Sequence, residues 1–409
     1  MLKWSVWILA VTFYLYEYLL RVFPSAATHA IMETFGLHAT SFGLMVAFYL
    51  YGYAPMQLVS GLLMDRFGAR IWLTLSTILC ALGAFVFAGS DTFFMGAFAR
   101  LLMGIGSACA FVGVIYLSSH WFSAKFLPLL IGIGNSLGML GAAFGEGPIS
   151  FLSGKYGFDE INIVFGIFGL LLAVAIFFVI RNDPPKKQNV PPLERSPMLA
   201  SLKAAFTNRP LWINALSALF FYAPTIAFGA LWAAPFVTVA YKTSQHLGAL
   251  ASSMFYFGWI VGGPIFGKLA LNSKDRARDV ALAPLGALIS LIALIYFPVQ
   301  HLSWAFVWLF IAGGFCSAEL LHYTISIELS SPNIKGTASA VTNFVVFIGG
   351  AILQPLIGII LDLFWTGQME GRLRLYSLES YQIALSIFPL ALIIASLISW
   401  FKLRPRFNT

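Results

Sequence analysis

The sequence predicts an all-α membrane protein with twelve transmembrane helices in two pseudo-symmetric six-helix halves. Hydrophobic residues make up 59% of the 409 residues, and charged residues make up only 10%. The mean hydropathy is +0.86, and apolar stretches of about 18 or more residues recur along the chain, long enough for a helix to cross a bilayer. A soluble core does not tolerate this composition. We therefore expect a multi-pass integral membrane protein that has the lipid bilayer as a partner.

Turn-forming residues separate the apolar stretches of the first part of the chain. Gly89-Ser90-Asp91 follows the third stretch, and Gly154-Lys155-Tyr156-Gly157 follows the fifth. Each predicted helix is about 20 to 30 residues long, as a tilted span requires. The first six predicted spans are residues 4–33, 40–64, 71–89, 92–119, 126–153 and 160–180.

The second part of the chain repeats this pattern. Asn272-Ser273-Lys274-Asp275 and Ser331-Pro332-Asn333 separate two further pairs of apolar stretches. The predicted spans are residues 210–238, 246–271, 279–298, 303–328, 336–364 and 378–401.

A polar stretch divides the chain between the sixth and seventh predicted spans. It contains the segment DPPKKQNVPPLERSP, whose prolines and lysines cannot build a core and are typical of a linker. The sequence thus predicts a six-helix bundle over residues 1–180, a cytoplasmic linker over 181–209 and a second six-helix bundle over 210–409.

The lysines and arginines predict the orientation in the membrane. With both termini in the cytoplasm, eighteen of the 24 basic residues lie on the cytoplasmic side and four lie outside. The remaining two, Arg21 and Arg100, fall within predicted spans. This asymmetry follows the positive-inside rule. The sequence pI of about 9.4 does not indicate nucleic-acid binding, because the basic residues mark the ends of spans.

A ten-residue segment between the second and third spans concentrates charge in an apolar region. It reads GLLMDRFGAR, from Gly61 to Arg70. Asp65 and Arg66 can lie only where water or helix ends receive their charge, and Gly61 is small enough for two helices to approach closely. The segment resembles the loop between the second and third helices of major facilitator superfamily transporters. The resemblance implies that Gly61, Asp65, Arg66, Gly68 and Arg70 form a conformational switch.

Other parts of the chain extend this resemblance. Asp65-Arg66 recurs as Asp275-Arg276, and Lys125 recurs as Lys335, in both cases 210 residues further along. RLLMGIGSA, starting at Arg100, is similar to the family's fourth helix. The fifth predicted span carries small residues at spacings that permit close helix crossings, namely Gly134, Gly138, Gly141 and Gly145. The resemblance implies two halves that rock about a site near the membrane midplane, with spans one, four, seven and ten lining the cavity.

No sequence motif indicates a cofactor or a metal. The segment GGPIFGK fits part of a phosphate-binding loop, but Leu269 stands where that loop needs Ser or Thr, and no strand precedes it. Cys80, Cys109 and Cys316 lie inside apolar runs without a second ligand at metal-binding spacing. We expect packing roles for all three cysteines.

The few ionisable residues inside the spans are the candidates for function, because each costs about 3 kcal/mol to insert unless it is paired or hydrated. In the first span, Tyr14, Glu17, Tyr18 and Arg21 are spaced to share one helical face. The fourth span holds Arg100. The tenth holds Glu319, His322, Tyr323 and Ser326 at a similar helical spacing, and the seventh holds Tyr222 beside Pro224.

Structural roles compete with functional ones at several of these positions. Glu17 and Arg21 can neutralise each other as a structural pair, and Arg100 can hold structure or take part in proton coupling. His322 by itself is more often an interior residue, but beside Glu319 it is suited to proton exchange. We expect Glu146 and Asp362, near the outer ends of their spans, to reach the interface between membrane and water. Packing is expected for most of the series Tyr49, Tyr51 and Tyr53.

A guanidinium, a carboxylate and tyrosines at mid-depth suit a zwitterion, since Arg binds a carboxylate while Glu and aromatic faces accept an ammonium group. An amino acid or short peptide fits this pattern. The segments YLYEYLLRVFPS and FYLYGYAPMQLVSGLLMDRFGAR also resemble the proteobacterial intraphagosomal amino-acid transporter (Pht) group and, more distantly, lysosomal dipeptide carriers. The predicted solute-binding residues are Tyr14, Glu17, Tyr18, Arg21, Tyr222 and Tyr323. The predicted proton-coupling residues are Glu17, Glu319, His322 and Arg100.

The sequence therefore predicts a monomeric secondary transporter of the bacterial inner membrane, a symporter that couples amino-acid transport to protons by alternating access. An exporter of metabolites, drugs or siderophores is the alternative, because a broad aromatic cavity serves it equally well. An intramembrane enzyme or receptor is a remote alternative. We see no Ser/His/Asp arrangement or paired metal motif at a common depth.

Overall fold

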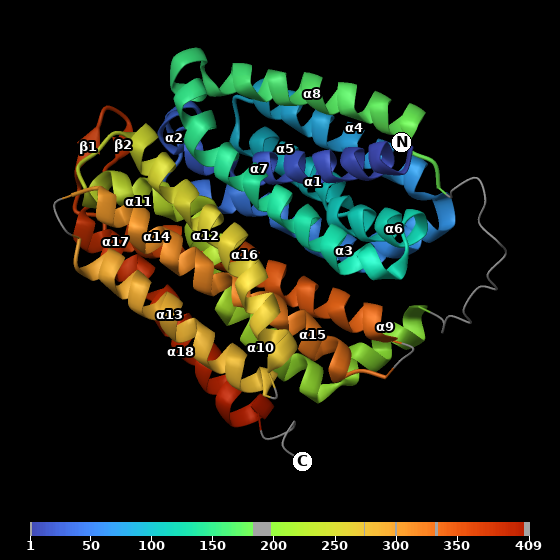
Figure 1. Ribbon diagram of the computed structural model, residues 1–409. Coiled ribbons are helices and arrows are strands. Elements are labelled where there is room, and N and C mark those ends of the chain that lie inside the picture. The colour runs from blue at the N-terminus through green and yellow to red at the C-terminus, as the bar shows by residue number, and fades with distance from the viewer. Residues whose placement is uncertain (1, 183–197, 274, 299–300, 332–333, 405–409) are drawn as a thin grey trace.

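A computed structural model of the chain describes residues 2–182, 198–273, 275–298, 301–331 and 334–404. Twelve helical segments within these residues are long and apolar enough to cross a membrane, as the sequence predicts. Figure 1 shows them as two helical bundles lying side by side.

The first bundle contains the helices up to residue 179. Its first helix ends at Ala26, seven residues before the predicted end of span one, and the short helix α2 follows it after Ala27. The elements are α1 (Leu2–Ala26), α2 (Thr28–Phe35), α3 (Ala39–Phe67), α4 (Ala69–Ala88), α5 (Phe93–Ser107), α6 (Ala110–Trp121), η1 (Ala124–Phe126), α7 (Leu127–Tyr156) and α8 (Phe158–Val179).

The second bundle contains the remaining spans. The predicted linker lies mostly outside the described residues, but its last part forms helix α9, whose Ala205 is buried beside Leu211. The elements are α9 (Met198–Thr207), α10 (Arg209–Ala223), η2 (Pro224–Trp232), α11 (Ala233–Ala240), α12 (Gln245–Asn272), α13 (Arg276–Tyr296), α14 (Ser303–Cys316), η3 (Ser317–Leu320), α15 (Leu321–Glu328), α16 (Lys335–Leu363), β1 (Met369–Glu370), β2 (Leu373–Arg374), α17 (Leu378–Leu385), α18 (Ile387–Ile398) and η5 (Ser399–Leu403).

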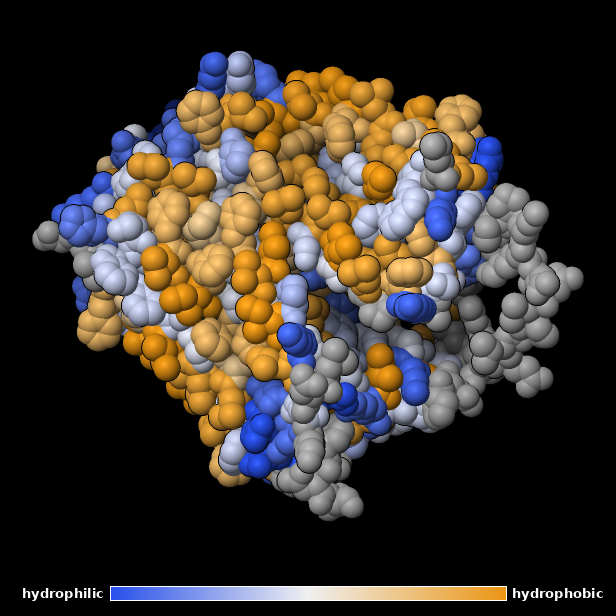
Figure 2. Space-filling model, in the orientation of Figure 1, coloured by the Kyte–Doolittle hydropathy of each residue, from blue (hydrophilic) through white to orange (hydrophobic). Residues whose placement is uncertain are grey.

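Different elements lie at the two ends of the molecule. The antiparallel pair β1 and β2 and helix α2 mark the hairpin face. The start of α1 and the end of η5 mark the opposite end, here called the terminal face (Figure 1). Figure 2 shows hydrophobic residues across the middle of the visible surface and hydrophilic ones towards both ends, the pattern of a protein that spans a bilayer.

Small residues let the helices of the first bundle pack closely. A Cβ atom on Gly141 of α7 would lie 2.3 Å from the carbonyl oxygen of Leu15, and one on Gly138 would lie 2.4 Å from the ring of Tyr14. The close crossing expected from the glycine series of the fifth span is therefore confirmed, and its partner is α1. This crossing fixes the depth of α1 in the bundle.

The two halves are joined at the hairpin face and separated at the terminal face. Near the hairpin face, a Cβ on Gly43 of α3 would lie 2.6 Å from Gln354 O of α16, and one on Gly358 would lie 2.3 Å from Ala39 O. Near the terminal face, a Cβ on Gly61 or on Gly336 would meet no described atom within 4 Å. Figure 2 shows the surface hollowed between the two halves at this end. The structure is therefore open at the terminal face.

Candidate functional site

The centre of the candidate site is an ion pair on α1. The Nη2 atom of Arg21 donates to both carboxylate oxygens of Glu17, at 2.8 and 2.9 Å. Both side chains are buried, with relative exposures of 5% and 0%. The hydroxyl of Tyr49 on α3 also donates to Glu17 Oε2 at 2.8 Å. The charge of Glu17 is thus balanced and hydrogen-bonded within the protein, which fulfils the paired arrangement expected from the i, i+4 spacing.

Aromatic rings surround the guanidinium of Arg21. The guanidinium carbon lies 4.3 Å from the ring centre of Tyr18, 4.7 Å from that of Tyr53 and 5.0 Å from that of Phe347, all within the range of cation–π attraction. Phe347 belongs to α16 of the second half, so the two halves meet at Arg21. The Arg21 Nε atom has no hydrogen-bond partner among the described residues, so at least one N–H donor of the guanidinium is unused.

Tyr14 is held differently from Tyr18. Its ring packs on Phe111 at 5.0 Å between ring centres and touches the position of Gly138, while its hydroxyl lies 3.5 Å from that of Tyr18. Tyr14 therefore lies beside the ion pair without contacting it directly.

Arg100 binds backbone atoms of α1. Because Pro24 has no N–H group, the carbonyl of Leu20 lacks its usual helical partner, and Arg100 Nη1 donates to that oxygen at 2.6 Å. Its Nη2 donates to the Arg21 carbonyl at 3.1 Å, and the guanidinium lies 4.7 Å from the Tyr49 ring centre. This geometry positions the segment that carries Arg21.

The second half contributes Tyr222 and Glu319. Tyr222 of α10 lies 6.0 Å from Phe347 and 5.9 Å from Trp259, measured between ring centres. Glu319, in η3, is 1% exposed, and its Oε1 atom has no hydrogen-bond partner among the described residues. The carboxyl group of Glu319 lies near Tyr222 and Tyr323.

His322 and Tyr323 point to different neighbours. His322 Nδ1 lies 2.7 Å from Asn214 Oδ1 on α10, whereas the Tyr323 hydroxyl donates to Asn343 Oδ1 on α16 at 2.7 Å. Among the described contacts, none joins His322 to Glu319. The proposed pairing of these two groups for proton exchange therefore stays a prediction.

The expectation that most of the series Tyr49, Tyr51 and Tyr53 serves packing was wrong, because each of the three makes a polar or cation–π contact. Spaced four residues apart on α3, the rings of Tyr49 and Tyr53 both face Arg21, and Tyr49 binds Glu17. The i, i+4 spacing was visible in the sequence, but it did not indicate which helix the rings face. Tyr51 points away from them and donates to the Ala351 carbonyl, which Pro355 leaves without its helical partner.

The charged loop after α3 lies at the terminal face. Arg70 Nε donates to the Phe177 carbonyl at the end of α8, at 2.6 Å, where helix carbonyls attract a cation. Gly68 has a φ of 79° and separates α3 from α4, and Arg66 is exposed. The predicted role of Asp65 concerns a side chain outside the described ones. The close helix approach expected at Gly61 is absent here because the halves are apart.

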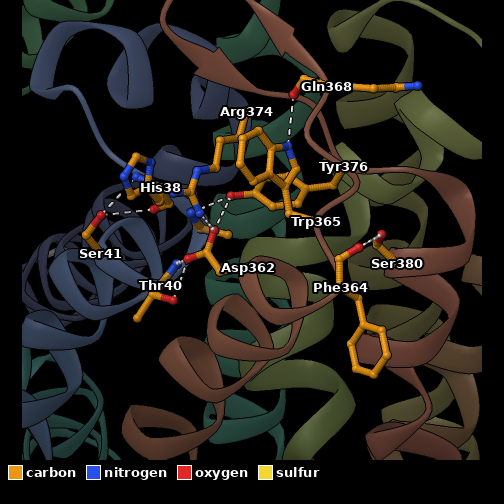
Figure 3. A network of polar contacts seen from close by, with 11 residues as sticks. His38, Thr40, Ser41, Asp362, Phe364, Trp365, Gln368, Arg374, Tyr376 and Ser380 are labelled. Atoms are coloured by element: carbon orange, nitrogen blue, oxygen red, sulfur yellow. Dashed lines mark hydrogen bonds and ion pairs between the residues drawn. The ribbon is translucent and has the colours of Figure 1, made fainter.

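A polar network joins the halves at the hairpin face (Figure 3). Asp362, at the end of α16, accepts hydrogen bonds from Thr40 N and Thr40 Oγ1 at the start of α3, at 2.9 and 2.5 Å. Its other oxygen accepts from Tyr376 at 2.6 Å and from Arg374 at 3.2 Å. Tyr376 also accepts a bond from Ala39 N at 3.0 Å. We call this group the hairpin lock.

The Tyr376 hydroxyl keeps its proton in the hairpin lock. Burial raises the pKa of Tyr376 well above its ordinary value, and the adjacent Asp362 carboxylate raises it further. The hydroxyl therefore remains a donor to Asp362 throughout the physiological pH range.

Glu146 and Asp362 were both expected at the interface between membrane and water, and of these two only Asp362 is partly exposed, at 16%. Glu146 is 0% exposed, so the expectation that it reaches the interface was wrong. Its neighbours Gly145 and Gly147 let α1 and α12 pack over it, a tertiary contact that the position of Glu146 along its span does not reveal.

Comparison with known proteins identifies the family of this chain. The family model of the Major Facilitator Superfamily matches residues 6–354. A putative tartrate transporter of Agrobacterium vitis is 24% identical over 383 residues, covering 88% of this chain and 84% of that protein. A probable L-galactonate transporter of Escherichia coli (strain K12) is 26% identical over 166 residues, covering 41% of this chain and 37% of that protein.

The fold has solved counterparts. A bacterial homologue of the human lysosomal transporter Spinster, in an inward-facing and unoccupied conformation, matches with a TM-score of 0.78 and 19% sequence identity. The match covers 99% of this chain and 97% of that one. This similarity shows a common fold.

Proposed function

This chain belongs to the Major Facilitator Superfamily, and from this membership we propose that it carries a small carboxylate-bearing solute by alternating access with proton coupling. The observation that carries the proposal is the buried Arg21, placed where the two halves meet. Its guanidinium uses one nitrogen for Glu17 and has an unpartnered Nε. A carboxylate can accept hydrogen bonds from the remaining donors of the planar fork.

An amino acid or short peptide is the first candidate solute. Its carboxylate would bind Arg21, and its ammonium group would need an acceptor elsewhere, because Glu17 is already engaged by Arg21 and Tyr49. Glu319 offers a carboxyl oxygen that has no hydrogen-bond partner among the described residues. Tyr222 and Tyr323 lie near this carboxyl group, and their ring faces attract cations. The Pht-like segments of α1 and α3, which supply Arg21 and its aromatic shell, support this candidate.

A hydroxy acid or sugar acid is the second candidate. The relatives named as tartrate and L-galactonate transporters carry solutes of this type by name. Such an anion needs a cation for its carboxylate and hydrogen-bonding partners for its hydroxyls, which Arg21 and the tyrosines provide. It does not need a carboxylate at Glu319 to balance an ammonium group.

The terminal face is assigned to the cytoplasm in this proposal, because the basic residues concentrate there. The structure would then be the conformation open to the cytoplasm, in the inner membrane of a bacterium. We expect the transporter to act as a monomer, with Glu17, Glu319, His322 and Arg100 as the candidates for proton coupling.

Uptake into proteoliposomes tests the proposal. Labelled amino acids, dipeptides and hydroxy acids would be offered with and without an imposed pH gradient. We expect Arg21→Lys to lower solute affinity by about tenfold or more, because the lysine ammonium lacks the planar fork and loses at least one charge-assisted hydrogen bond of about 1.5–3 kcal/mol. Arg21→Ala should be worse, since it leaves Glu17 buried without its cation.

Lys155→Ala is the control, because it also removes one positive charge. Lys155 is exposed at the hairpin end of α7, far along this helix from Gly138, the position that packs on Tyr14. If Arg21→Lys binds solute with wild-type affinity, Arg21 is a structural counter-ion. Uptake of amino acids but not hydroxy acids selects the first candidate, and the reverse selects the second.

A further inference from the structure

Glu146 is a buried carboxyl group that none of the roles assigned above uses. It lies on α7 with 0% exposure, and neither of its oxygens has a hydrogen-bond partner among the described residues. The flanking glycines explain how it is enclosed. A Cβ on Gly145 would lie 2.7 Å from Val22 of α1, and one on Gly147 would lie 2.7 Å from the Ser253 hydroxyl of α12. Glu146 is therefore enclosed where the first half meets the second.

Three polar side chains lie near it, and two of them have no hydrogen-bond partner among the described residues. These side chains are Ser25 of α1 and Ser252 and Tyr256 of α12. The hydroxyls of Ser25 and Tyr256 have no hydrogen-bond partner among the described residues, while Ser252 makes one long bond of 3.5 Å to the Gly229 carbonyl. This cluster, Glu146 with Ser25, Ser252 and Tyr256, is here called the interface acid cluster.

No positive charge within the described residues neutralises Glu146. On α1, Arg21 is paired with Glu17. On α12, the titratable groups are Tyr256, His246 towards the hairpin face, which contacts Ser150, and Lys268, more than five helical turns further along the helix from His246. On α8, Asp159 and Glu160 lie at the hairpin end, and from η2 the backbone carbonyl of Gly229 accepts a hydrogen bond from Ser252.

An ionised carboxylate without a partner is far costlier to bury than a carboxylic acid. The interface around it forms only when α7 and α12 come together, as they do here through Gly147 N and Ser253, at 2.9 Å. Opening the hairpin face separates these helices and admits water to the cluster. The protonation state of Glu146 and the closure of this face must therefore be linked.

We propose that Glu146 is a proton-binding site that controls the closure of the hairpin face. With that face open, a Glu146 oxygen takes a proton from the water on that side, forming an O–H bond, and the neutral acid is then enclosed by α1 and α12. When the face reopens, the O–H bond breaks and the proton returns to the same water. The inference rests on alternating access, which is part of the proposed function, but it does not require Glu146 to carry protons across the membrane.

Distance measurements between spin labels test this inference without any solute. Cysteines introduced at Asp91, between α4 and α5, and at Thr366, after α16, lie at the hairpin face on opposite halves and are exposed. The three native cysteines are buried, so the labels report on the introduced positions. In the otherwise wild-type protein we expect a short distance at acid pH and a growing population of longer distances as the pH rises.

Glu146→Gln, which mimics the protonated acid, should keep the short distance at every pH, whereas Glu146→Asp should keep a pH response and so shows that the site tolerates substitution. Glu160→Gln removes an exposed carboxylate from the same half and should respond as the wild type does. A wild-type pH response in Glu146→Gln, or no pH response in the wild type, overturns the inference. Failure of solute uptake with this response intact would instead count against the proposed solute and coupling.

Discussion

The hairpin lock sets how strongly the two halves are held together at one face. Three of its hydrogen bonds join the two halves. Two run from Thr40 of α3 to Asp362 of α16, and one runs from Ala39 N to the Tyr376 hydroxyl. Asp362→Asn removes the negative charge and offers one oxygen acceptor where the carboxylate offers two. The Thr40 N–H, at the start of α3, also loses the favourable interaction of a helix N-terminus with an anion.

The size of the effect follows from these contacts. A neutral hydrogen bond contributes about 1 kcal/mol, and one to a charged group about twice that. Replacing two charge-assisted bonds by two neutral ones, or losing one of them, therefore weakens closure by about 2 kcal/mol. This corresponds to about a 30-fold shift in the ratio of closed to open molecules.

The spin-label pair at Asp91 and Thr366 measures this shift at fixed pH. We expect Asp362→Asn to increase the population of long distances, and Glu379→Gln, which removes an exposed carboxylate from the same face and half, to leave it unchanged. An unchanged distance distribution in Asp362→Asn would show that the lock contributes nothing to closure, and that helix packing alone holds this face together.

Two further predictions concern the loop and the tenth span. Asp65→Asn should impair transport with normal membrane insertion, because the closed terminal face needs a carboxylate near a cation or a helix N-terminus; wild-type transport kinetics would count against this switch. Glu319→Gln and His322→Gln should each abolish accumulation of solute against a gradient while exchange survives, because exchange needs no net proton movement. In His322→Gln the amide can still bond Asn214, so a loss of accumulation reports on the proton rather than on the hydrogen bond. Concentrative uptake by both variants under an imposed pH gradient would move the coupling role to Glu17 or Arg100.

Sequence patterns anticipated the local part of the candidate site. The pairing of Glu17 with Arg21 follows from their i, i+4 spacing, which brings the two side chains together on any helix. The close packing of the α7 glycines was also predictable, because small residues at helical spacing have few other uses inside a membrane.

The aromatic shell of Arg21 was not predictable in the same way. Tyr53 of α3 and Phe347 of α16 come from helices far apart in the chain, and Trp259 reaches Tyr222 from α12. Which face of each helix meets Arg21 depends on the crossing of α3 with α16, where backbones approach at Gly43 and Gly358. The contact between α3 and α16 cannot be predicted from the local pattern of either helix.

The features that could be predicted without a structure are those that depend on a residue and its neighbours along the chain. Hydropathy and the distribution of charge identified the twelve spans, because insertion of a helix into lipid is decided segment by segment. The packing of distant helices determines which charged groups find a partner of opposite charge or a hydrogen-bond partner and which do not. Arg100 donates to α1 carbonyls because Pro24 frees one of them. Glu146 is enclosed without a hydrogen-bond partner among the described residues because α1 and α12 pack over it. Both outcomes depend on contacts between distant segments, so the energies that set them exist only in the folded chain.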